Sequence, residues 1–364
     1  MNKIKVFLAR KGVVCSFRQY GVDALGAMAQ GLFCTLLVGT ILNTLGQQLH
    51  IGFLTAPVVS VGTVSYTVGG LASAMVGPGI AVAIGTALHC PPLVLFSLIP
   101  VGFAANAMGG AGGPLAVYAV TIIAAELGKL VSKETRIDIL VTPCVTVIAG
   151  IAVAQLIAAP IGTAARAVGL AIMWATELQP FFMGVLVSAL IGIALTLPIS
   201  SAAICAAFGL TGLAGGAAVA GCCAQMVGFA VMSFKENRWG GLVAQGVGTS
   251  MLQMPNILKN PRIWIPPTLA SMITGPLATC VFKLQMTGSP VSSGMGTCGF
   301  VGQIGVYTGW VSDIAAGTKA AITPMDWIGL VLICFILPAV LSTLFCRVLE
   351  KRGWIREGDM KLDL

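Results

Sequence analysis

The sequence predicts an all-α membrane protein, because the chain is very hydrophobic, carries little charge and contains many long apolar runs. Hydrophobic residues make up 57% of the 364 residues and charged residues only 9%, and the mean hydropathy is +0.96. A soluble domain carries about 25% charged residues, so this chain could not cover a water-soluble fold of its length. Apolar runs of about 18–20 residues fit one helical crossing of a hydrocarbon core roughly 30 Å thick. We expect about ten crossings and no soluble domain.

The apolar runs set the expected order along the chain. A basic arm over residues 1–20, with an amphipathic pattern, precedes a membrane domain over 21–350, and a tail covers 351–364. The expected spans lie at about 24–46, 53–88 (two crossings, or one and a broken second), 93–108, 115–131, 139–160, 180–199, 202–233, 240–255, 268–283 and 326–346. A weaker run covers 162–178, and the proline-rich strip 255–267 is expected to be a loop.

The net charge of +8 is concentrated at the two ends of the chain. Half of the basic residues lie there: Lys3, Lys5, Arg10, Lys11, Arg18, Arg347, Lys351, Arg352, Arg356 and Lys361. The positive-inside rule therefore predicts an inner-membrane protein with both termini in the cytoplasm. This arrangement requires an even number of crossings. The short arm carries no recognisable nucleic-acid motif, so we expect no nucleic-acid partner.

Several classes of chemistry lack their sequence signals. The cysteines show no CxxC pair or metal-ligand spacing, so we expect neither a disulfide framework nor a metal site. There is no P-loop, which argues against ATP hydrolysis by this chain. The first apolar run has no small-residue cleavage site after it, so we expect it to remain as a span. We expect no cofactor and no catalytic residue.

Three glycine- or proline-rich interruptions fall between apolar runs: 106–114, 198–201 and 288–299. Irregular backbone at membrane depth survives only when it is buried in protein or lines a wet cavity, because its polar groups need partners. Broken helices of this kind present main-chain groups to a solute near the middle of the bilayer. The alternative is that each interruption is a turn at the membrane surface.

Polar residues at or beside these interruptions are the candidates for binding a solute. They are Asn106, Gly110, Gly112, Gly113, Ser200, Ser201, Gln253, Asn256, Ser292 and Ser293. Amide side chains suit hydroxylated ligands because each offers a donor and an acceptor, although any of them could instead join two helices. Glu177 and His89 complete the set, since ionisable residues near membrane depth are usually functional. The alternatives are an interfacial carboxylate at a helix end and an ordinary interfacial histidine.

Five strings carry a resemblance to a known family: NAMGGAGGPLAVYAV (106–120), KETRIDILVTP (133–143), LPISSAAI (197–204), LQMPNILKNPRIWIPPTLAS (252–271) and GMGTCGFVGQIG (294–305). The chain resembles enzyme IIC, the membrane subunit of bacterial phosphoenolpyruvate-dependent phosphotransferase systems, in its stand-alone form that includes perfringolysin-regulator-like proteins. The resemblance covers roughly 25–350. It implies a homodimer of about ten spans per chain with re-entrant hairpins, and a sugar site that moves like an elevator.

In sugar-bound members of that family, a carboxylate near a hairpin tip and a histidine contact the sugar hydroxyls. The carboxylate is often followed directly by proline, whereas here two residues separate Glu177 from Pro180. His89 matches no motif of the family.

The predicted function is that of a permease for a sugar or a similar polyhydroxylated solute. In the phosphotransferase reading, separate IIA and IIB phosphocarriers would supply the phosphoryl group, and the chain itself would only bind and move the solute. Two alternatives stay open: a secondary transporter or facilitator on the same fold, and a membrane sensor that regulates gene expression. Neutral amides and hydroxyls with little interior positive charge argue against a multiply charged anion.

Overall fold

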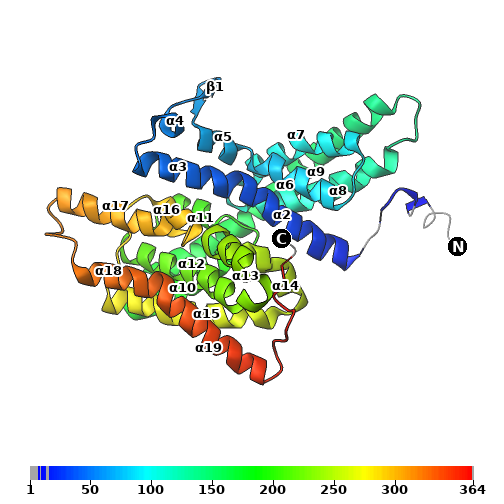
Figure 1. The fold of residues 1–364 in the computed structure, drawn as a ribbon. Coiled ribbons are helices and arrows are strands. Elements are labelled where there is room, and N and C mark those ends of the chain that lie inside the picture. The colour runs from blue at the N-terminus through cyan, green and yellow to red at the C-terminus, as the bar shows by residue number, and fades with distance from the viewer. Residues whose placement is uncertain (1–6, 9, 14–15, 363–364) are drawn as a thin grey trace. The chain divides into compact units, whose positions relative to one another are not determined.

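The computed structural model describes residues 7–8, 10–13 and 16–362, and these are almost entirely helical. The chain forms two compact units, unit 1 over Met1–Ala164 and unit 2 over Ala165–Leu364 (Figure 1). The boundary between them falls inside the long helix α9 (Asp138–Thr176).

Unit 1 begins with a continuous helical stretch from Arg18 to Gln48. Its elements before α9 are η1 (Arg18–Asp23), α2 (Ala24–Leu32), η2 (Phe33–Leu37), α3 (Val38–Gln48), α4 (Gly52–Thr55), β1 (Val59–Val61), β2 (Val64–Tyr66), α5 (Val68–Ala74), α6 (Val76–Ala87), α7 (Pro92–Gly109), η3 (Gly110–Gly112) and α8 (Gly113–Val131).

Helices α7 and α8 form an antiparallel hairpin whose tip is Gly109–Gly113. Near the open end, a Cβ on Gly128 would lie 2.8 Å from Val94 Cγ1, and near the tip a Cβ on Gly113 would lie 2.4 Å from Asn106 Oδ1. The chain reverses at Gly110, whose φ of +52° favours glycine. The prediction that 106–114 is not a regular helix holds only for Gly110–Gly112, because 106–109 belong to α7 and Gly113 begins α8.

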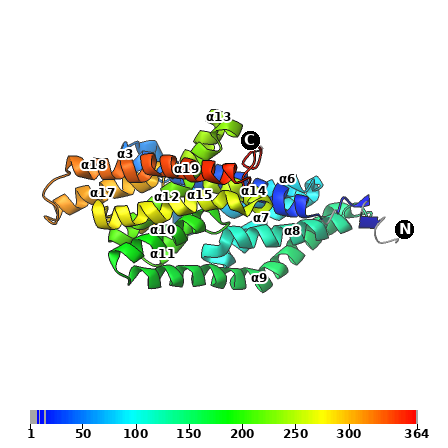
Figure 2. The same ribbon diagram turned by 90° about the horizontal axis from the view of Figure 1, so that it is seen from below.

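Unit 2 completes the chain after α9. Its elements are α10 (Pro180–Thr196), α11 (Ser201–Ala207), α12 (Gly212–Met232), α13 (Phe234–Val243), η4 (Ala244–Gly248), η5 (Ser250–Gln253), α14 (Met254–Lys259), η6 (Pro261–Trp264), α15 (Ile265–Pro276), η7 (Leu277–Val281), α16 (Pro290–Ser293), η8 (Cys298–Phe300), α17 (Val301–Ala315), α18 (Pro324–Val331), η9 (Leu332–Ile336) and α19 (Leu337–Lys351). Helix α12 packs against α10, α15 and α19 (Figure 2).

Glycines allow the central helices of unit 2 to pack backbone against backbone. A Cβ on Gly221 of α12 would lie 1.9 Å from Ser188 O of α10, and a Cβ on Gly275 of α15 would lie 2.1 Å from Gly184 O of α10. Helices in lipid associate through such small residues, since there is no hydrophobic driving force between them. The high glycine content of the sequence thus has a packing role.

Among the described residues, five helical stretches are long and apolar enough to cross a membrane: Arg18–Gln48, Pro92–Val131, Asp138–Thr176, Gly212–Met232 and Pro324–Lys351. The pair α5–α6, bent by 54°, is a sixth candidate. The expected number of about ten is higher, because the α7–α8 hairpin counts as one stretch and because other apolar runs form helices shorter than 18 residues. Helix α10, for example, has 17 residues.

Three local expectations were wrong. The separate runs 139–160 and 162–178 form the single helix α9, which contains Pro143 and Pro160. The strip 255–267 is largely helical, because its prolines occupy first turns, where a missing N–H costs nothing. The run that begins at 53 includes the exposed hairpin β1–β2, with Val61 paired to Val64 across a turn at Gly62, where φ is +60°.

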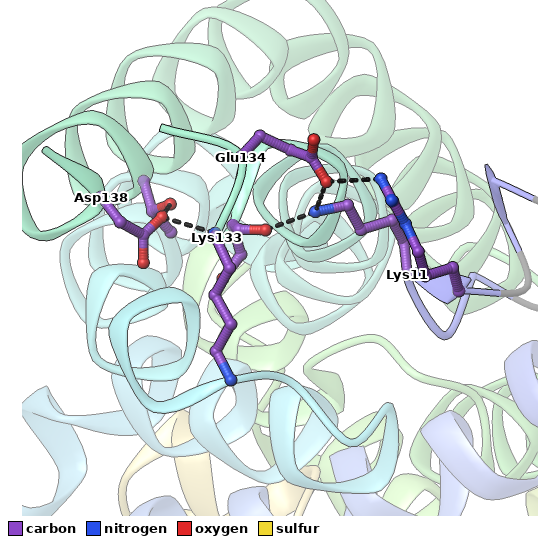
Figure 3. A network of polar contacts seen from close by, with 7 residues as sticks. Lys11, Lys133, Glu134 and Asp138 are labelled. Atoms are coloured by element: carbon purple, nitrogen blue, oxygen red, sulfur yellow. Dashed lines mark hydrogen bonds and ion pairs between the residues drawn. The ribbon is translucent and has the colours of Figure 1, made fainter. Parts of the chain in front are cut away.

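The described part of the basic arm contacts the loop between α8 and α9. Arg10 Nη2 lies 2.7 Å from Glu134 Oε1, and Lys11 Nζ pairs with the same carboxylate and donates to the Ser132 carbonyl (Figure 3). Among the described residues of the arm, Phe7, Leu8 and Arg10 are helical before a turn at Lys11. The amphipathic helix expected over 1–20 falls in part on residues 1–6, 9, 14 and 15, which lie outside the described residues.

These contacts predict that the attachment of the basic arm to the α8–α9 loop depends on pH. The hydrogen bond from Lys11, helped by the charge of Arg10, lowers the pKa of the Glu134 carboxyl below its ordinary 4.5. A lowered pKa gives stabilisation that is complete above pH 4.5 and is lost as the pH falls through the folded value. The anisotropy of a fluorophore on the amino terminus should therefore fall as the pH is lowered below 4.5 and through the folded-state pKa of Glu134. Glu134→Gln should be mobile at every pH, whereas Glu357→Gln should follow the unmodified protein; an unchanged Glu134→Gln profile would refute the role of this carboxylate.

Candidate functional site

Two broken segments of unit 2 meet each other through their serines. Ser201 Oγ, at the start of α11, donates to Gly294 O at 2.7 Å, and Ser293 Oγ, at the end of α16, donates to Leu210 O at 2.6 Å. Both serines are buried. Their hydroxyls thus satisfy main-chain carbonyls that the breaks release from helical hydrogen bonding.

Backbone contacts close the same junction. Gly212 N donates to Met286 O at 2.9 Å, and Met286 N donates to Gly212 O at 3.0 Å. A Cβ on Gly294 would lie 2.6 Å from both the carbonyl carbon and oxygen of Ser201. We call the group Ser201, Gly212, Met286, Ser293 and Gly294 the hairpin junction. It brings together segments about 90 residues apart in the sequence.

A cluster of amide and hydroxyl groups lies beside the broken helix η4–η5. Gln225 is its centre: its Nε2 donates to Thr268 Oγ1 at 3.1 Å, and its Oε1 accepts from the Trp264 indole at 3.0 Å and from Thr196 Oγ1 at 3.3 Å. Thr196 Oγ1 also lies 2.8 Å from Ser250 Oγ. We call these five residues the polar core. The side chains of Thr196, Gln225 and Ser250 are fully buried.

A second row of buried amides leads from the interior to the carboxyl-terminal tail. Gln245 Nε2 donates to Ser233 Oγ, Gln253 Nε2 donates to Gln245 Oε1 at 2.8 Å, and Asn256 Nδ2 donates to Gln253 Oε1 at 2.9 Å. Gln253 and Asn256 also donate to the carbonyls of Met360 and Lys361. The amide donors of this row are therefore occupied by the protein itself.

The tail is held along its length by α13 and by the segment around α14 (Figure 1). The Glu236 carboxylate accepts from Gly358 N and Met360 N, and Asn237 both donates to Met360 O and accepts from Leu362 N. Asn260 Nδ2 donates to Trp354 O and Asp359 Oδ2. The side chains of Ile355 and Met360 are each only 2% exposed. We call residues 353–362 the tail strap.

The polar side chains buried in unit 2 are uncharged. Its buried polar side chains are serines, threonines, glutamines and one asparagine, and among the described residues of this unit no Asp, Glu, Lys, Arg or His is buried. A buried charge without a partner is strongly unfavourable, whereas a buried amide or hydroxyl is stable once hydrogen-bonded. This interior can therefore exchange hydrogen bonds with a neutral solute but offers no counter-ion to a charged one.

The sequence matches the family described as "Phosphotransferase system, EIIC" over residues 22–362. This match covers nearly the whole chain. The chain belongs to the phosphotransferase system EIIC family. Comparison with curated proteins and with solved structures found no match. This EIIC chain is thus a multi-pass membrane component of a sugar phosphotransferase system, as the five sequence strings indicated, and the match does not specify a solute.

The structure divides the candidate residues of the EIIC chain between its two units. Ser201 and Ser293 meet in the hairpin junction, where Ser292 is also buried; Ser200 caps α11 by accepting from Ala203 N. Gln253 and Asn256 contact the tail strap. Glu177 is exposed in the turn between α9 and α10, and among the described residues its side chain makes no hydrogen bond to Ser201 or Ser293.

The remaining candidates lie in unit 1 of the EIIC chain. Asn106, Gly110, Gly112 and Gly113 surround the tip of the α7–α8 hairpin, and among the described residues the Asn106 side chain has no hydrogen bond. His89 is exposed in the turn before α7, with a φ of +52°. Since α7 separates the two places by about 21 Å of helix at 1.5 Å per residue, His89 cannot contact a solute held by Asn106.

One ion pair of the EIIC chain was missed in the sequence. Lys129 is 2% exposed, lies 2.8 Å from Glu126 Oε1, and donates to the carbonyls of Leu88 and Gly12. Two charges three residues apart inside the apolar run 115–131 were the available signal, since ionisable residues within spans are costly and usually have a function.

Proposed function

We propose that this EIIC chain binds a neutral sugar, or a similar polyhydroxylated solute, within unit 2 and carries it across the membrane. The observation that supports this most directly is the set of buried, uncharged polar side chains inside unit 2. Hydroxyl groups of a solute can replace the mutual hydrogen bonds of Gln225, Thr196 and Ser250 one for one, because amides and hydroxyls both donate and accept. A charged solute would lose its hydration there without gaining a partner.

The hairpin junction suits the same role. Its carbonyls and serine hydroxyls belong to helices that end inside the unit, so a modest rearrangement would expose main-chain groups to a solute. We propose that Ser200, Ser201, Ser292 and Ser293 line the solute path beside the polar core.

We further propose the topology expected for the family. Both termini would be cytoplasmic, about ten segments would cross the bacterial inner membrane, and two copies would form a dimer in which the solute-holding part moves like an elevator. A IIB phosphocarrier at the cytoplasmic side would phosphorylate the solute and make its release one-way. In unit 1, we propose that the tip of the α7–α8 hairpin around Asn106 contributes to the solute path, because the backbone there is irregular.

Uptake into reconstituted vesicles tests the role of the polar core. Gln225→Leu keeps the size of the side chain but removes hydrogen bonds worth about 0.5–1.5 kcal/mol each, so the half-saturating concentration of radiolabelled hexoses or hexitols should rise by up to about tenfold. Gln303→Leu is the matched control, because Gln303 is also buried in unit 2, its Oε1 has no partner among the described residues, and its Nε2 donates only to the weak acceptor Cys223 Sγ. Equal uptake by both variants would remove the polar core from the path.

The same vesicles distinguish phosphotransfer from transport driven by a gradient. Product inside the vesicles should carry phosphate and should accumulate only when a phosphoryl donor and the IIA and IIB proteins are enclosed. Accumulation of unmodified solute without a donor would instead assign the chain to the secondary transporters.

A further inference from the structure

A polar pocket of about 390 Å³ lies in unit 2, where the segment after η7 passes the ends of α17 and α18. Its walls include Lys283, Gln285, Trp310, Asp313, Lys319 and Asp326. The volume falls within the range of about 300–1,000 Å³ that is usual for small-molecule sites. None of these residues was a candidate in the sequence.

The charges of the pocket balance. Lys319 Nζ lies 2.9 Å from Asp326 Oδ1, and Asp326 is fixed further by the N–H and hydroxyl of Thr323. Asp313 Oδ2 accepts from Thr287 Oγ1 at 2.9 Å, while its other oxygen and the Lys283 ammonium have no partner among the described residues. The pocket thus offers one free acceptor and one free donor of opposite charge, with no net charge.

The backbone connects this pocket to the hairpin junction. Along residues 283–286, exposed and buried side chains alternate: Lys283 and Gln285 are exposed, and Leu284 and Met286 are buried. The segment therefore alternates between the pocket and the core. Met286, which pairs with Gly212 in the junction, directly follows Gln285. Lys283 has a φ of +47°, a left-handed conformation that a lysine adopts at a conformational cost and glycine would adopt without one.

The pocket lies at the far end of unit 2 from the tail strap. Asp326 is in the first turn of α18, while the tail strap follows α19, and the helical stretch Pro324–Lys351 between them has 28 residues (Figure 1). At 1.5 Å per residue this is about 42 Å, which is enough to span the bilayer. With the tail in the cytoplasm, as proposed above, the pocket opens on the outer side.

We infer that this pocket is an outer capture site for a neutral polyhydroxylated solute, which it presents to the hairpin junction; this inference rests on the proposed function. The free oxygen of Asp313 accepts from a solute hydroxyl, the Lys283 ammonium donates to another, and the Gln285 amide can do either. The pocket has no net charge that would favour an anion or a cation, and the buried polar side chains of unit 2 include no counter-ion, so a neutral solute suits both.

The test compares solutes of one size and different charge on the full chain in nanodiscs and in vesicles. The probes are glucose and glucitol, with glucuronate as the anionic and glucosamine as the cationic counterpart. Asp313→Asn keeps the acceptor for Thr287 but removes the charge, and Lys283→Gln removes the free ammonium from an exposed position that folding does not require. Lys351→Gln, at the other end of the same helical stretch, is the control.

We expect the neutral solutes to bind best, and each pocket variant to raise the half-saturating concentration of uptake about tenfold with an unchanged maximal rate. Lys351→Gln should match the unmodified chain. Preference for glucuronate or glucosamine, or uptake curves of Lys283→Gln that coincide with the unmodified chain, would overturn the capture site while leaving solute uptake intact. Absence of uptake of all four probes by the unmodified chain would count against the proposed function itself.

Discussion

Removal of the tail strap, by ending the chain after Arg352, should destabilise unit 2 by on the order of 5 kcal/mol. The loss has two sources. Two fully buried side chains, Ile355 and Met360, contribute about 1.5–3 kcal/mol each, and the amides of Gln253 and Asn256 would be left partly unpaired at about 1–3 kcal/mol each. The melting temperature in detergent and hydrogen exchange over 237–256 measure the effect.

A point variant separates burial from polar contacts in the tail strap. Met360→Ala removes a buried side chain but keeps the backbone groups that Glu236, Asn237 and Gln253 bind, so it should cost about 2–5 kcal/mol, less than truncation does. Arg356→Gln is the control, because that side chain is exposed. If truncation leaves the melting temperature and the exchange rates unchanged, the strap does not stabilise unit 2.

Gly294→Ala should have the second largest effect, by separating the two sides of the hairpin junction. The new Cβ would lie 2.6 Å from Ser201 C and O and 2.8 Å from Ala202 N, and these main-chain atoms cannot rotate away as a side chain would. Overpacking of this kind costs about 1–3 kcal/mol, and the Ser201–Gly294 hydrogen bond would be lost with it. Both the melting temperature and the rate of solute uptake should fall.

Gly240→Ala provides the matched control for this substitution. Gly240 lies in α13, and nothing lies within 4 Å of an added Cβ. Alanine favours helix over glycine by about 0.8–1 kcal/mol, so this variant should be slightly more stable and should transport normally. A Gly294→Ala protein that behaved like Gly240→Ala would show that the two broken segments do not need their close contact.

The sequence predicted where helices break better than it predicted which side chains contact each other. Proline at 198–201 and glycine at 288–299 predicted the two breaks, because a local property of the backbone decides where a helix cannot continue. The sequence did not predict that Ser201 would bind Gly294, since 93 residues separate them and only the folded unit brings them together. Likewise, Gln253 and Asn256 stand out beside a break, but their partners in the tail strap lie more than 100 residues away.

The errors have local physical causes. Prolines marked 255–267 as a loop, although proline at the start of a helix is favourable and each helix there begins with one or two. Valines of the β1–β2 hairpin counted as part of an apolar span, because hydropathy does not distinguish a strand from a helix. The polar pocket escaped notice since its residues come from three separate segments and none lies within a glycine-rich interruption.

The tail strap also bears on how the chain matures during synthesis. A polypeptide emerges from the ribosome amino terminus first, so residues 353–362 appear after every helix of unit 2. Until Met360 and Lys361 arrive, Gln253 and Asn256 lack the carbonyls that they bind in the finished fold. Unit 2 therefore completes its buried hydrogen bonds only when the last residues of the chain have been made.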